Sequence, residues 1–149
     1  MENLIEFLQS QKLFTLATTN SQTPWVANVY MCSDEKGKLY FISPTDTRHS
    51  QEILVNNSVA FATAWFNPED STDRKGVQGT GICRIAETED EITKGVKLHN
   101  SKCPEFKERI TVEWIHNNDK DSKVWVITPK YIKYWNDRKP ETKEQEFNF

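Results

Sequence analysis

The chain has 149 residues, a net charge of −3 at pH 7 and 11% aromatic residues. A chain of this length buries about two-thirds of the surface that its unfolded form exposes, so we expect one domain over residues 1–149 with its own hydrophobic core. Lysines and arginines alternate with acidic residues instead of gathering into the basic patch of a nucleic-acid-binding protein. Binding to nucleic acid is therefore not expected.

The cysteines and the first residues indicate the compartment. Cys32, Cys83 and Cys103 are widely spaced and odd in number, so free thiols in a reducing compartment are expected rather than a disulfide framework. Glu2 and Glu6 stand where a secretion signal carries basic residues. No stretch approaches the roughly 20 apolar residues of a membrane span. The sequence predicts a soluble cytoplasmic protein that does not associate with membranes.

The first part of the chain predicts one helix and three strands. Residues 2–11 carry apolar side chains at helical spacing and predict a short amphipathic helix. Apolar and β-branched runs at 13–20, 25–34 and 38–43 predict three strands joined by short turns, an antiparallel meander. Gly37 is expected to take a positive φ in the turn before the third strand.

The rest of the chain alternates between helical and extended patterns. Residues 105–122 fit either a strand or a helical piece, and the glycines between 76 and 81 predict a bulge or bend. The remaining expected elements are a helix at 45–56 capped by Asp46 or Thr47, a strand at 59–66, a polar loop at 67–75, a strand at 76–87, a helix at 88–104, strands at 124–129 and 131–135, and a polar tail at 136–149.

This set of elements predicts the fold class. Six or so short strands, two or three helices and no alternating βα pattern predict a mainly β (α+β) fold with a closed or sandwiched antiparallel sheet.

The segment with the clearest chemistry is the start of the helix expected at 45–56. A strand ends, a proline-containing turn follows, and the helix opens with Thr47, Arg48 and His49. The unpaired N–H groups and the dipole of a helix N-terminus favour an anion, and a guanidinium adds bidentate geometry for phosphate. Ordinary capping, with Arg48 and His49 merely exposed, explains the same residues.

The order of the motifs resembles the flavin-binding split-barrel family around pyridoxamine 5'-phosphate oxidase. The run GKLYF followed by Thr47-Arg48-His49 resembles the family's phosphate-binding segment. LFTLATTN resembles its first strand, TPWVANVY the strand along the flavin ring, and VWVITPKYIKYW its last strands. The resemblance implies a six-stranded antiparallel Greek-key split barrel and a homodimer with cofactor sites at the subunit interface.

The resemblance also implies roles for individual residues towards flavin mononucleotide (FMN). The family's third phosphate residue is commonly Lys and here is His49, which is mostly neutral at pH 7, so phosphate binding is expected to be weaker or pH-dependent. The basic substrate residues of the true oxidases are not recognisable in the tail, which indicates a different branch. The expected cofactor contacts are Thr47, Arg48 and His49 at the phosphate, Ser43 at the phosphate or ribityl chain, Ala27, Asn28 and Val29 beside the ring, Gln78 from the second subunit, and Trp135 as a late aromatic.

Several functions remain open at this point. The leading hypothesis is a flavin-dependent oxidoreductase of unknown substrate, with no assigned catalytic residues because the cofactor carries the redox chemistry. A non-catalytic flavin or haem sensor or carrier is the alternative, with His49, His99 and His116 as available haem ligands. A deazaflavin would present a phosphate to the same kind of site, and a cofactor-free dimerisation module is a third possibility. His99 and Cys103 share a helix face, but two ligands do not make a metal site, so none is expected.

Overall fold

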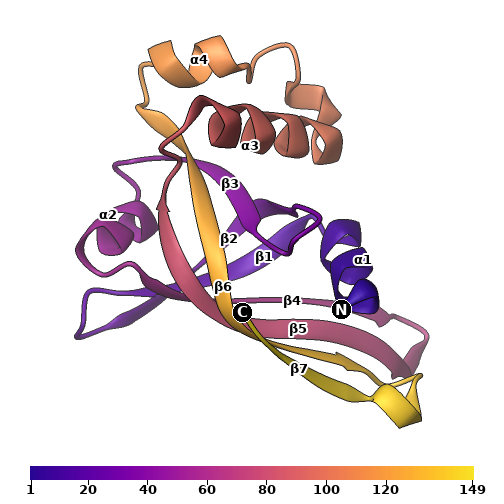
Figure 1. Cartoon of the computed structure of the whole chain (residues 1–149). Helices are drawn as coiled ribbons and strands as arrows, with labels where there is room; N and C mark the ends of the chain where they lie inside the picture. Colours follow the sequence, from indigo (N-terminus) through magenta and orange to yellow (C-terminus); the bar gives the residue numbers. More distant parts are fainter.

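The computed structural model describes residues 1–149, except for the side chain of residue 142. The chain forms both helices and strands, and the strands form one sheet (Figure 1). In order they are α1 (Glu2–Ser10), β1 (Leu13–Thr19), β2 (Pro24–Ser33), β3 (Leu39–Pro44), α2 (Arg48–Val55), β4 (Ser58–Asn67), β5 (Asp70–Ile85), α3 (Glu89–Lys102), η1 (Pro104–Phe106), α4 (Val112–Asn117), β6 (Ser122–Asn136), η2 (Pro140–Thr142) and β7 (Glu144–Asn148).

The sheet closes into a six-stranded antiparallel barrel. Its strand order is β3-β2-β1-β4-β5-β6-β7, and a further pairing of β3 with β6 closes the ring. After the β1-β2-β3 meander the chain returns through α2 and places β4 beside β1, which is a Greek key. The expected antiparallel split-barrel class is confirmed. The seventh strand lies outside the ring and pairs with β6 alone.

β6 is one strand where the sequence predicts two. Residues 122–127 pair with β3 and residues 131–135 pair with β7, so the same edge of β6 serves two partners in turn. Pro129 is tolerated because the register with β5 shifts opposite Thr80 and Gly81, which confirms the predicted bulge. The strand therefore bends through the proline instead of ending there.

Two further expectations about elements were wrong or incomplete. The polar loop expected at 67–75 is mostly the beginning of β5, which starts at Asp70 and forms a long ribbon with β4. The polar tail contains η2 and β7. In both places most side chains are polar and the backbone pairs with a neighbouring strand. The sequence there lacks the apolar alternation that marks a half-buried strand. The undecided stretch 105–122 contains η1 and α4.

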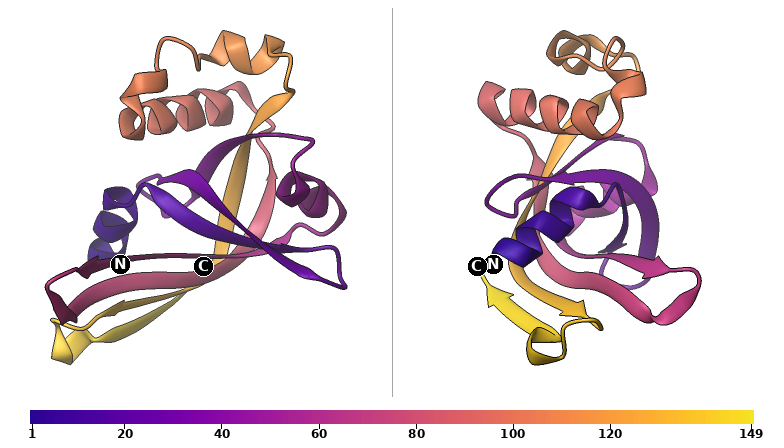
Figure 2. Two further views of the ribbon diagram at one scale, coloured as in Figure 1. Left: turned by 180° about the vertical axis from the view of Figure 1, so that it is seen from behind. Right: turned by 90° about the vertical axis from the view of Figure 1, so that its right-hand side faces the viewer.

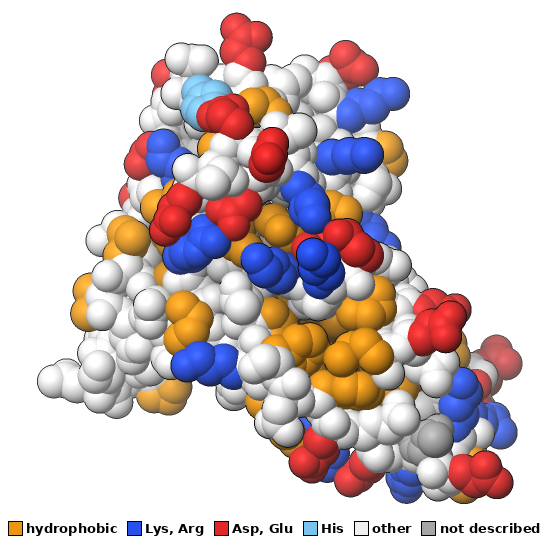
Figure 3. All heavy atoms as spheres, viewed as in Figure 1, with side chains coloured by type: hydrophobic (Ala, Val, Ile, Leu, Met, Phe, Trp, Pro, Cys, Tyr) orange, Lys and Arg blue, Asp and Glu red, His pale blue; other side chains and the backbone are white. Residues whose placement is uncertain are grey.

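The helices surround the barrel on three sides. α1 and α2 lie at opposite ends of it, and α3 with α4 forms a layer across a third side (Figures 1 and 2). α1 places Leu4, Phe7 and Leu8 in the main core, while Val96 of α3 belongs to a second core cluster with Val124 of β6. On the face drawn in Figure 3, Lys and Arg side chains alternate with Asp and Glu. Over the described residues no helix is both long and apolar enough to cross a membrane.

Candidate functional site

The site begins where β3 ends and α2 starts. Pro44 is the last residue of β3, and Thr47 takes an extended backbone with φ −68° and ψ 153° before the first helical turn. The Thr47 hydroxyl accepts a hydrogen bond from the Ser50 backbone N–H at 3.3 Å. Of the two caps that the sequence allowed, the structure therefore has Thr47, and Asp46 is exposed.

Two hydroxyl groups converge on one imidazole at this helix start. The Oγ of Ser43 lies 2.8 Å from Nε2 of His49, and the Oγ1 of Thr47 lies 3.1 Å from the same nitrogen. Ser43 is buried, and its carbonyl accepts a hydrogen bond from the indole N–H of Trp125 at 3.0 Å, which fixes the end of β3. The three side chains can turn O–H and N–H groups towards one anion.

The imidazole of His49 is half-buried, and this determines its charge. Burial lowers its pKa below the ordinary value of 6.5, and the nearby Glu52 carboxylate opposes this shift only in part. The neutral form of His49 therefore predominates at pH 7.

Arg48 is held by two neighbours. Its guanidinium carbon lies 4.1 Å from the centre of the Trp25 ring, a cation–π arrangement, and its Nε donates to the Glu52 carboxylate at 3.2 Å. The Arg48 side chain is 47% exposed. Because the recorded contact uses Nε, the two terminal nitrogens remain available to bind an anion in a bidentate manner.

Glu52 is part of the site, and the sequence reasoning missed it. Its side chain is only 7% exposed, and it accepts a second hydrogen bond from the Thr18 hydroxyl at 2.5 Å. The Thr18 bond, followed by Arg48, holds the pKa of Glu52 below its usual range against the effect of burial. The four-residue spacing from Arg48 is the pattern that could have indicated it.

The ring-side residues lie on the strand that carries Trp25. Successive side chains of a strand point to opposite faces, so Trp25, Ala27 and Val29 share one face of β2 and Asn28 lies on the other. Ala27 and Val29 are half-buried, while Asn28 is exposed and accepts a hydrogen bond from Thr15 of β1 at 3.1 Å. The face of β2 on which Trp25 contacts Arg48 therefore also carries Ala27 and Val29, two of the residues predicted to lie beside the flavin ring.

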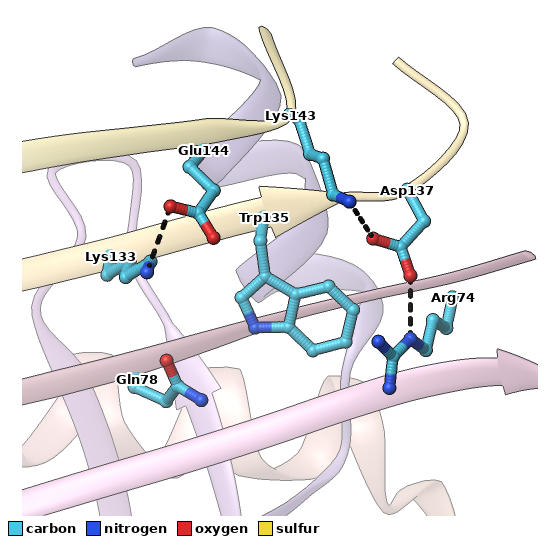
Figure 4. A pocket seen from close by; sticks show the side chains of 7 residues that line it. All are labelled: Arg74, Gln78, Lys133, Trp135, Asp137, Lys143 and Glu144. Carbon is cyan, nitrogen blue, oxygen red and sulfur yellow. Dashed lines mark hydrogen bonds and ion pairs between the residues drawn. The ribbon is translucent and has the colours of Figure 1, made fainter. Parts of the chain in front are cut away.

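Gln78 and Trp135 form a second group. They line a pocket of about 300 Å³ whose other walls are three cations and two carboxylates from β5, β6 and the C-terminal segment (Figure 4). The carboxylate of Asp137 lies 2.6 Å from Nε of Arg74 and 3.6 Å from Nζ of Lys143. The carboxylate of Glu144 lies 3.1 Å from Nζ of Lys133. Among the described side chains no hydrogen bond or ion pair joins this pocket to Arg48 or His49. The contribution of Gln78 from a second subunit stays a prediction.

The remaining candidates from the sequence lie elsewhere. All three cysteines are free and buried. His99 packs against Phe106 with ring centres 6.0 Å apart, and the exposed His116 pairs with Glu89 at 2.9 Å. Within the part of the chain that the structure describes, no group of three or more His, Cys, Asp and Glu side chains is arranged to hold a metal ion.

Comparison with known proteins establishes the family. A UPF0306 protein of Pasteurella multocida is 26% identical over 133 residues, which cover 89% of this chain and 80% of that protein. Among solved structures, a heme binding protein from Mycobacterium smegmatis superimposes with a TM-score of 0.73 at 16% identity, over 93% of this chain and 53% of that one, so this chain spans about half its length. A NimC/NimA family protein from Clostridium acetobutylicum superimposes with a TM-score of 0.65 at 18% identity. The match covers 100% of this chain and 92% of that protein's chain. The family model described as pyridoxamine 5'-phosphate oxidase matches residues 1–136, and the chain belongs to that family.

Proposed function

We propose that this protein binds FMN as a homodimer and acts as a flavin-dependent oxidoreductase. The observation that carries the proposal is the convergence of the Ser43 and Thr47 hydroxyls on His49, beside the guanidinium of Arg48. These groups fit a phosphate because all of them can donate hydrogen bonds and lie at the positive end of a helix dipole. The site suits the terminal phosphate of a mononucleotide.

The residues of the chain bind and orient the cofactor in this proposal. Ser43, Thr47, Arg48 and His49 hold the phosphate, and the face of β2 that follows Trp25 supports the ring at Ala27 and Val29. The flavin supplies the electron transfer when bound, and the protein contributes orientation and electrostatics. The three free, buried cysteines agree with a reducing compartment, and we place the protein in the cytoplasm.

The proposed dimer rests on an apolar face of the barrel. Thr15 and Ala17 of β1, Ala60 and Ala62 of β4, and residues 78–80 of β5 line a shallow hollow of about 350 Å³ together with two residues of β6. Small side chains let a second sheet approach closely. We call this set, whose β6 residues are Tyr131 and Lys133, the alanine face. Gln78 lines both this hollow and the Trp135 pocket, so the pocket borders the expected interface.

The test is a titration of the purified protein with FMN, followed by its absorbance and fluorescence. We expect saturable binding near one flavin per chain. Arg48→Ala should weaken it at least tenfold, because a hydrogen bond to a charged group contributes about 1.5–3 kcal/mol and 1.4 kcal/mol is tenfold. Arg109→Ala is the matched control, since that arginine packs on Phe106 and lies outside the site. Unchanged affinity in Arg48→Ala would remove the phosphate assignment.

The second candidate is a non-catalytic binding protein, and the mycobacterial heme binding protein of similar fold favours its haem form. In this chain the available imidazoles are His49, His99 and His116. Haem titration of the purified protein would show a Soret band, and its loss in one of three His→Ala variants would identify the ligand. A protein that binds flavin but passes no electrons from reduced nicotinamide to any acceptor would support the flavin form of this candidate.

A further inference from the structure

The fixed charges around the start of α2 cancel in pairs. The Nε of Arg48 lies 3.2 Å from Oε1 of Glu52 on the same helix. Lys123 of β6 is the register partner of Ser43, and its Nζ lies 2.8 Å from Oδ1 of Asp121. The neighbouring strands contribute uncharged side chains only. These are Thr18 from β1, Trp25 from β2, and Phe41 and Ser43 from β3. Asp46 is exposed in the turn before the helix. The described groups at the site therefore add up to no net positive charge.

Glu52 cancels the charge of Arg48 in a fixed geometry. Its two oxygens are used separately, Oε1 by Arg48 and Oε2 by Thr18, so the carboxylate cannot turn away without losing one of them. Both contacts favour the ionised form of the carboxylate. The ring of Trp25 contacts the same guanidinium. Arg48 is thus well oriented for an anion, but its charge is already balanced.

A phosphate monoester brings more negative charge than this site neutralises. Its second pKa is about 6, so it carries between 1.5 and 2 negative charges at pH 7. The adjustable charge among the groups that touch the site is the imidazole of His49, which is neutral in the free protein. A proton placed on that imidazole, or kept on a phosphate oxygen, reduces the excess negative charge of the occupied site by one unit.

We propose that Glu52 is a positioning and specificity residue: it orients Arg48 and cancels its charge, so that the site accepts a phosphate monoester together with one proton shared with His49. The inference rests on the proposed function and deepens it, because it states the charge form of the phosphate that the site selects. Dianionic phosphate is bound poorly unless the proton is supplied.

The first test compares FMN with riboflavin, which has the same ring and no phosphate. The ratio of the two dissociation constants isolates the contribution of the phosphate. We expect FMN binding to the wild-type protein to weaken between about tenfold and about fiftyfold from pH 6 to pH 8, since one linked proton changes affinity by up to tenfold per pH unit above the phosphate pKa of about 6. Riboflavin binding should stay constant. Calorimetry at pH 7.5 in two buffers of different ionisation enthalpy should show net proton uptake with FMN and none with riboflavin.

Variants then separate positioning from charge. Glu52→Gln keeps groups that can bond Arg48 and Thr18 but leaves the guanidinium charge uncancelled, so FMN should bind several-fold more tightly at pH 8 with a flatter pH profile. His49→Lys supplies a permanent charge and should flatten the profile as well. Glu105→Gln, which removes the carboxylate of an ion pair to Lys12, is the matched control and should leave both ligands unaffected.

The outcomes distinguish this inference from the proposed function. If FMN binds more tightly than riboflavin and needs Arg48, but wild-type affinity is flat between pH 6 and pH 8, the inference is overturned and FMN binding stands. Equal pH profiles for wild type and Glu52→Gln overturn the role of Glu52. If neither flavin binds, the proposed function fails and this inference fails with it. The wild-type pH profile tests the shared proton even if Glu52→Gln does not fold, because a flat profile overturns the inference without any variant.

Discussion

Thr18 contributes a pH-dependent part of the stability through one hydroxyl group. Its hydrogen bond is the largest influence that lowers the pKa of Glu52 from the ordinary value of 4.5. A lowered folded-state pKa stabilises the fold at pH values above 4.5, and this stabilisation is lost as the pH falls through the lowered value. We therefore expect Thr18→Val to reduce the melting temperature clearly at pH 7 and much less at pH 3.

Thermal melts of Thr18→Val at the two pH values provide the measurement. Thr63→Val is the control, because the Thr63 hydroxyl is also buried but donates to the backbone carbonyl of Leu13 at 2.9 Å, a neutral acceptor. Its cost should be the same at both pH values. A Thr18→Val deficit that does not change with pH would show that Glu52 is not the reason for it.

The sequence indicated the residues of the phosphate site that are close together along the chain. Thr47, Arg48 and His49 are consecutive, and Ser43 lies four positions before Thr47, near the end of β3. The short connection between the strand and the helix therefore brings these side chains together. Their role towards a cofactor stays a prediction. Glu52 could not be assigned in this way, because its burial depends on Thr18, which is 34 positions away on β1. Sequence spacing showed only that Arg48 and Glu52 could pair on the helix.

At the scale of an element, β5 depends on a glycine that lets an aromatic ring lie against the strand. A Cβ added at Gly79 would collide with the ring of Phe61 and would lie 2.9 Å from the carbonyl oxygen of Tyr131. Gly79→Ala should therefore lower the free energy of unfolding by roughly 1–3 kcal/mol, as is typical of overpacking. Chemical denaturation measures this, and Thr128→Ala, at an exposed position of the neighbouring strand β6 outside the alanine face, should cost much less.

A double-mutant cycle tests the assigned cause. If the Phe61 ring is the obstacle, Phe61→Leu in the Gly79→Ala background should cost less than the sum of the two single changes, because the residues touch. Strict additivity would place the strain at the Tyr131 carbonyl instead.

The elements that the sequence predicted well are those with an apolar face. α1, the meander and α3 each bury such a face, and their observed bounds lie within about two residues of the predicted ones. The beginning of β5 and β7 escaped detection, because most of their side chains are polar and their backbones pair with β4 and β6, although Phe147 of β7 packs against the main core. The continuity of β6 escaped for a different reason, since Pro129 normally ends a central strand and only the bulge permits it.

For the whole molecule, the proposed dimer predicts a change of mass and of cofactor binding from one substitution. Ala62 lies in the middle of the alanine face, where an arginine would prevent close approach of a second sheet and would be costly to bury. We expect wild-type protein to sediment at twice the mass of the 17.4 kDa chain. Ala62→Arg should sediment as a monomer and lose most of its FMN affinity, although Arg48 and His49 are unaltered.

The control for this experiment puts the same side chain on another surface. Ser101 is exposed on α3, in the helical layer away from the alanine face, so Ser101→Arg should leave both the mass and the FMN affinity unchanged. If Ala62→Arg became monomeric and still bound FMN at wild-type affinity, each chain would hold the cofactor alone, and Gln78 and Trp135 would not contribute from a second subunit. A dimer that persisted in Ala62→Arg would place the interface on another face of the barrel.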